Sequence, residues 1–137
     1  MIVADAIVDI ILAHEPQTLA IYLYGSYGTA DEWPDSDVDL AILLPPVETR
    51  QRSSAWLAGC RSALMTALGK SVDLVIARDV STVLQKEIVA TGRLLLVADS
   101  NAVAEFEMLT LSLYQKLNDE RREILEAFHA TGRAYDV

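Results

Sequence analysis

Two short apolar runs on either side of a polar stretch constrain what this chain can fold into. The first covers residues 19–24 and ends at Gly25, and the second covers residues 40–44. Both are bounded by turn-forming residues, which predicts two buried strands. Asp37 and Asp39 open the second strand two residues apart, so both carboxylates project from one face, about 7 Å apart along it.

Two carboxylates on one face indicate a metal site. Their mutual repulsion costs stability unless a cation lies between them, and magnesium takes carboxylate oxygens as ligands. Residues 35–39 also imitate the start of an EF-hand calcium loop. That loop requires Gly at its sixth position and Glu at its twelfth, where this chain has Leu40 and Pro46. The calcium-loop interpretation therefore fails.

A third carboxylate, Asp73, lies inside the apolar segment 71–77, which predicts a further strand. Burying an unpaired carboxylate costs several kcal/mol, on the order-of-magnitude scale. Its position is explained if this strand lies beside the second one, so that Asp73 joins the other two aspartates. The alternative is a strand-end aspartate paired with Lys70 or Arg78.

Gly25 and Ser26 follow the first strand directly. Glycine permits a sharp turn and lets the backbone approach a ligand closely. Ser26 stands where a short helix would begin, so its hydroxyl and the nearby backbone N–H groups could hold a phosphate. Taken alone, Ser26 would be a helix N-cap, but the downstream carboxylates favour the phosphate-binding role.

The pattern Gly25-Ser26, ten residues, then Asp37-Val38-Asp39 resembles the signature of the DNA polymerase β-like nucleotidyltransferase superfamily. In length the chain is most similar to the minimal nucleotidyltransferases (MNT proteins) of that superfamily. The resemblance covers residues 24–40, with weaker support to about residue 97. It implies the polymerase β-like nucleotidyltransferase fold.

The resemblance also implies the chemistry of the site. Nucleotidyl transfer needs a triphosphate that is held in place, an attacking oxygen that is aligned, and neutralisation of the charge that develops in the transition state. Two Mg²⁺ ions about 4 Å apart can neutralise that charge. By this resemblance ATP is the substrate and Gly25 and Ser26 hold its phosphates. The catalytic metal ligands are then Asp37, Asp39 and Asp73.

A biological role follows from the same resemblance. MNT proteins commonly act as antitoxins beside HEPN-domain ribonuclease toxins, and some inactivate the toxin by transferring AMP from ATP to a toxin tyrosine. The intact motif favours catalysis, so we expect a protein adenylyltransferase that forms a hetero-oligomer with its toxin. Two alternatives stay open: a non-catalytic antitoxin that occludes the toxin, and a small-molecule (antibiotic) nucleotidyltransferase, which would usually carry an additional substrate domain.

Composition limits the remaining classes of function. A chain of 137 residues with 52% hydrophobic residues predicts one folded domain, and a net charge of −9 argues against direct binding of nucleic acid. We expect no membrane span, because no apolar stretch reaches about 18 residues, and no signal peptide, because acidic residues interrupt the amino-terminal run. A single Cys60 excludes an internal disulfide and predicts a cytoplasmic location, and its place on an apolar helical stripe predicts a buried, inert thiol.

Periodicity predicts the other elements, and together they give a mixed sheet with packed helices, an α/β (α+β) fold. Helices are expected over residues 2–14, 49–68 and 79–91, the last capped by Asp79 or Ser81, and strands over residues 18–24, 71–77 and 93–97. Residues 101–130 are helical and would span about 45 Å. They form either one helix whose excess length docks another protein, or two helices folded over the sheet. We therefore predict a single nucleotidyltransferase domain over residues 1–137, with a core at about 1–98 and a helical segment at about 100–131.

Overall fold

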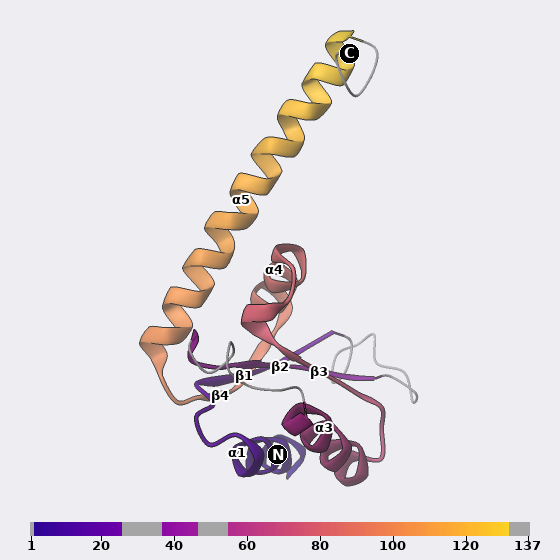
Figure 1. The fold of residues 1–137 in the computed structure, drawn as a ribbon, viewed down its shortest axis with the longest axis vertical. Coiled ribbons are helices and arrows are strands. Elements are labelled where there is room, and N and C mark those ends of the chain that lie inside the picture. Colours follow the sequence, from indigo (N-terminus) through magenta and orange to yellow (C-terminus); the bar gives the residue numbers. More distant parts are fainter. Residues whose placement is uncertain (1, 26–36, 47–54, 132–137) are drawn as a thin grey trace.

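The computed structural model describes residues 2–25, 37–46 and 55–131 (Figure 1). Its elements follow the predicted order, with a 3₁₀ turn that the sequence analysis did not predict. They are α1 (Ile2–His14), β1 (Ala20–Tyr24), β2 (Val38–Leu43), α3 (Ala55–Leu68), β3 (Val72–Ile76), η1 (Ala77–Asp79), α4 (Thr82–Thr91), β4 (Arg93–Val97) and α5 (Ser100–Thr131).

The four strands form one mixed sheet in the order β3-β2-β1-β4. β1 pairs antiparallel with both β2 and β4, whereas β3 pairs parallel with β2. A parallel pair needs a crossover connection, and α3 lies in the connection between β2 and β3. The mixed sheet and the position of the third strand beside the second are both as predicted.

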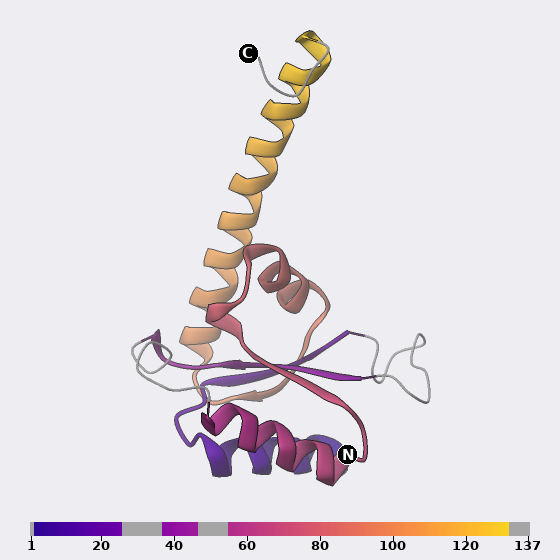
Figure 2. The same cartoon turned by 45° about the vertical axis from the view of Figure 1, so that its right-hand side comes forward.

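Helices cover both faces of the sheet, as Figures 1 and 2 show: α1 and α3 on one side, α4 and α5 on the other. Because side chains alternate along a strand, β2 contributes to two separate cores. Leu40 and Ile42 pack with Ile11 and Leu64 on the first side. On the second side, Leu43 packs in a cluster with side chains of β1, α4 and α5, including Tyr22, Ile88 and Phe106.

Two helix ends show why these residues start and stop helices. α3 is followed by Gly69, whose φ of +66° lies in the left-handed region that glycine adopts at low cost. α4 begins after Ser81, whose Oγ accepts a hydrogen bond from the Leu84 N–H at 3.2 Å. Of the two predicted caps, Ser81 is therefore the one used, and Asp79 instead ends η1.

α5 is one continuous helix of 32 residues, so the alternative of two helices folded over the sheet is wrong. Its first turns pack on the domain: Phe106 is buried, and the Tyr22 hydroxyl donates to Glu107 Oε2 at 2.7 Å. Farther along, Lys86 of α4 lies 5.2 Å from the centre of the Tyr114 ring. Residues 121–129 are exposed, and the helix projects away from the domain (Figure 1). No helix among the described residues is long and apolar enough to cross a membrane.

We expect the Cys60 thiol to be inert in the native protein. Cys60 is fully buried, as predicted, and burial raises its pKa to about 11. At pH 8 the thiolate fraction should then be about a hundredfold smaller than that of an ordinary cysteine. A disulfide reagent such as DTNB should react slowly with the native chain and at once after unfolding in guanidinium. Rapid stoichiometric reaction of the native chain would contradict this expectation.

Candidate active site

The strand register brings two of the predicted metal ligands side by side. In the parallel β2–β3 pair, Asp39 stands directly opposite Asp73. Asp37 immediately precedes β2, at the end of the sheet where β1 ends. Arg78 lies beyond the other end of β3, where its Nε donates to the Leu44 carbonyl at 2.6 Å. The predicted alternative of an Asp73–Arg78 pair is therefore wrong, and Asp73 lies beside Asp39 as predicted.

These carboxylates share the face of the sheet that carries α4 and α5. Tyr24 is the antiparallel partner of Asp39, and directly opposed residues project to the same side. Tyr24 packs in the core cluster under α4 and α5, so Asp39 and Asp73 project to that side at the sheet's end. The site therefore opens beside the face from which α5 projects.

Burial and like charge act together on Asp39. Its pKa is raised first by removal of the carboxylate from water, then by the negative charges of Asp73 and Asp37. The pKa of Tyr24 is likewise raised to about 12, by burial and then by Asp73 and Asp39. Asp73 and Asp37 thus both repel the partly desolvated carboxylate of Asp39, and a cation there would lower that energy.

Gly25 brings bare backbone against the same carboxylate. Its φ is +77°, and a Cβ added at this position would overlap Oδ2 of Asp39. Glycine is therefore required here for two independent reasons, a left-handed conformation and a lack of space. Ser26, the other predicted phosphate-binding residue, lies outside the described residues, so its role stays a prediction.

The donor set suits magnesium in its chemistry. Mg²⁺ prefers a small number of carboxylates together with phosphate oxygens and water, and Asp37, Asp39 and Asp73 offer only carboxylate oxygens. Among the described residues, no three His, Cys, Asp or Glu side chains already converge around a common point. The fit therefore lies in the electrostatics: burial first, and then the charges of Asp73 and Asp37, raise the pKa of Asp39, and a bound cation would relieve that repulsion.

The sequence analysis assigned no role to Tyr24, although its ring lies against the site. The signal was present, because Tyr24 is the last residue of the first strand, directly before Gly25. What the sequence lacked was the register: a shift of one residue would have turned Tyr24 to the opposite face.

Comparisons with known proteins agree with this geometry. Residues 7–101 match the polymerase β nucleotidyltransferase family, a range that contains Gly25 and the three aspartates. The protein adenylyltransferase MntA of Shewanella oneidensis is 32% identical over 122 residues, which cover 89% of this chain and 84% of MntA.

Solved structures extend the similarity to the whole fold. One is a toxin–antitoxin structure with AMP-PNP, with a TM-score of 0.77 and 29% identity over 92% of this chain and 98% of that chain. Another is an MNT antitoxin in complex with the tri-AMPylated HEPN toxin of Shewanella oneidensis, with a TM-score of 0.74 and 29% identity over 93% and 97% of the two chains. Together with the mixed sheet and the aspartates at its end, these matches show that the chain belongs to the polymerase β nucleotidyltransferase family.

Proposed function

We propose that this chain is an antitoxin that transfers AMP from ATP to a tyrosine of a cognate HEPN toxin, with which it forms a hetero-oligomer. The observation that carries the proposal is the register of β2 and β3, which sets Asp39 beside Asp73 next to the bare backbone of Gly25. The relative MntA is a protein adenylyltransferase, and the similar complexes contain AMP-PNP or an AMPylated toxin. Both support the same reaction for this chain.

Each site residue has a role in this proposal. The backbone at Gly25, with Ser26 after it, would bind the β- and γ-phosphates of ATP. Asp37 and Asp39 would be shared ligands of two Mg²⁺ ions, and Asp73 a ligand on the side of the attacking oxygen. When bound, the ions would neutralise the charge that develops on the phosphates. Asp73 is exposed and lies on the edge strand β3, so an acceptor protein can reach it.

The transfer step is a simple displacement. The tyrosine oxygen forms a bond to the α-phosphorus of ATP, and the bond from that phosphorus to the bridging oxygen breaks, releasing pyrophosphate. The hydroxyl proton would pass to Asp73, acting as the base. Residues 1–137 would act as one catalytic domain in the cytoplasm, with a core at about 1–98. The helical segment at about 100–131 would lie outside that core.

The intact mass of the toxin tests this proposal. The chain is incubated with the toxin encoded beside it, ATP and MgCl₂, and in a parallel sample with EDTA. We expect the toxin to gain whole AMP units only where magnesium is present. An unmodified toxin that is nevertheless neutralised in a stable complex would support occlusion. Pyrophosphate release with an aminoglycoside acceptor, and none with the toxin, would support an antibiotic transferase.

A further inference from the structure

Two tyrosines of β1 differ in what their hydroxyl groups contact. Tyr22 and Tyr24 are two residues apart, so they project from the same face of the sheet, and both are buried, at 1% and 7% exposed. The Tyr22 hydroxyl donates to Glu107 Oε2 at 2.7 Å. Among the residues that the structure describes, the Tyr24 hydroxyl has no hydrogen-bond partner. Because the hydroxyl of a buried tyrosine usually has a partner, we expect one for Tyr24 in the site beside it.

Two carboxylates of the site act on the Tyr24 hydroxyl. Burial first raises the pKa of Tyr24, and the negative charges of Asp73 and then Asp39 raise it further. The register agrees with this, because Tyr24 stands opposite Asp39, and Asp39 stands opposite Asp73. Neighbouring strands lie about 4.8 Å apart, so the backbones at Tyr24 and Asp73 are about 10 Å apart, a distance that the two side chains can span together.

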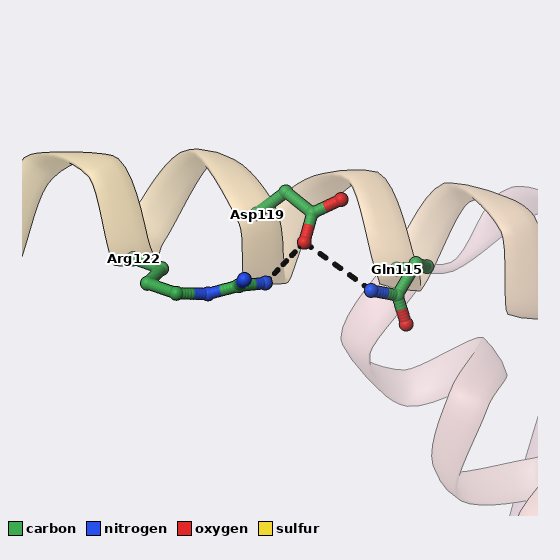
Figure 3. Close-up of polar contacts among 3 residues, drawn as sticks. All are labelled: Gln115, Asp119 and Arg122. Carbon is green, nitrogen blue, oxygen red and sulfur yellow. Dashed lines mark hydrogen bonds and ion pairs between the residues drawn. The ribbon is translucent and has the colours of Figure 1, made fainter.

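Asp73 also lacks a partner in the described part of the chain. It is exposed on the edge strand β3, and no described residue forms a hydrogen bond or an ion pair with its carboxylate. Asp119 on the surface of α5 shows the contrast: it accepts a hydrogen bond from Gln115 at 3.2 Å and pairs with Arg122 (Figure 3). The Asp73 carboxylate is therefore free to turn toward a donor.

We propose that Tyr24 is a positioning residue whose hydroxyl donates a hydrogen bond to the Asp73 carboxylate and orients it toward Asp39. A phenol keeps its proton at neutral pH and can donate, whereas an ionised carboxylate can only accept. Carboxylates that bind metals are themselves usually hydrogen-bonded, and loss of such a partner typically costs about ten- to a hundredfold in metal affinity or activity. The inference rests on the proposed function, in which Asp73 binds magnesium and acts as the base.

The magnesium dependence of thermal stability tests this inference without any transfer reaction. Melting temperatures are measured over a range of MgCl₂ concentrations in the presence of α,β-methylene ATP, whose α–β bridge the transfer reaction cannot cleave. We expect Tyr24→Phe to raise the MgCl₂ concentration that gives half of the stabilisation at least about tenfold. Tyr22→Phe is the matched control. It loses the hydrogen bond to Glu107, so its melting temperature without magnesium should fall while its magnesium dependence stays that of the wild type.

A double-mutant cycle tests whether Asp73 is the acceptor. Asp73→Ala alone should weaken magnesium binding, and Tyr24→Phe added to it should have no further effect on the magnesium dependence. Asp119→Ala is the control background, because it removes the same charge from α5, outside the site. In that background Tyr24→Phe should keep its full effect.

Each outcome decides between named possibilities. The positioning role is overturned if Tyr24→Phe has wild-type magnesium dependence, if its effect persists in Asp73→Ala, or if magnesium does not stabilise the wild type. A lower melting temperature without magnesium as the sole effect would make Tyr24 a core residue only. AMP transfer to the toxin by the wild type is measured separately. Its absence, together with the expected coupling of Tyr24 to Asp73, would refute the proposed function and leave the positioning role standing.

Discussion

Replacing Asp39 with Asn is expected to reduce AMP transfer at least about a thousandfold without unfolding the chain. The amide has nearly the shape of the carboxylate but is a poor ligand for magnesium. The substitution also removes the negative charge of Asp39. Asp73 and Asp37 then no longer repel it, a repulsion that together with burial raises the pKa of Asp39 in the wild type. The melting temperature without metal should therefore stay the same or rise. Rates come from the intact mass of the toxin, and stability from thermal unfolding.

Asp9→Asn is the matched control for this variant. Asp9 is exposed on α1, on the far side of the sheet from the site. Its replacement with Asn changes the net charge by the same amount as Asp39→Asn but leaves the site untouched. We expect wild-type transfer and no gain in melting temperature. Transfer by Asp39→Asn within tenfold of the wild type would remove Asp39 from the mechanism. Full neutralisation of the toxin by Asp39→Asn would show that binding, and not catalysis, protects the cell.

Replacing Gly25 with Ala should reduce transfer about a hundredfold and also lower the melting temperature. Alanine pays about 1–2 kcal/mol for the left-handed conformation, and its Cβ would displace the Asp39 carboxylate that it overlaps. Misplacing a reacting group by about 1 Å can cost about a hundredfold in rate. The same two measurements, mass of the toxin and thermal unfolding, report both effects.

Alanine variants of two other glycines separate the effect of backbone strain from the effect of steric overlap between the new Cβ and Asp39. Gly69 has a φ of +66°, but nothing lies within 4 Å of an added Cβ, so Gly69→Ala should lose stability and keep full transfer. Gly59 lies in α3 with no left-handed conformation and equally open space, so Gly59→Ala should gain about 0.5–1 kcal/mol. If Gly25→Ala transfers AMP as fast as Gly69→Ala does, the close approach of Gly25 to Asp39 has no catalytic importance.

The sequence was sufficient to predict the strands and the position of Asp73, because both rest on local chemistry. Apolar runs between turn formers indicate strands, and a carboxylate inside such a run requires an explanation nearby. The role of Tyr24 needed the register, which depends on pairing between distant segments. The continuous α5 was within reach of sequence reasoning, since residues 100–131 contain no Gly or Pro that would break the helix.

The far end of α5 lies outside both cores of the domain. Residues 121–129 add little to either core, so substitutions there do not destabilise the sheet or disturb the aspartates. Related chains can therefore diverge at this end of the helix while they retain the same sheet and the same aspartates. For the engineer, the same separation makes the end of α5 a place where residues can be exchanged or added without rebuilding either core.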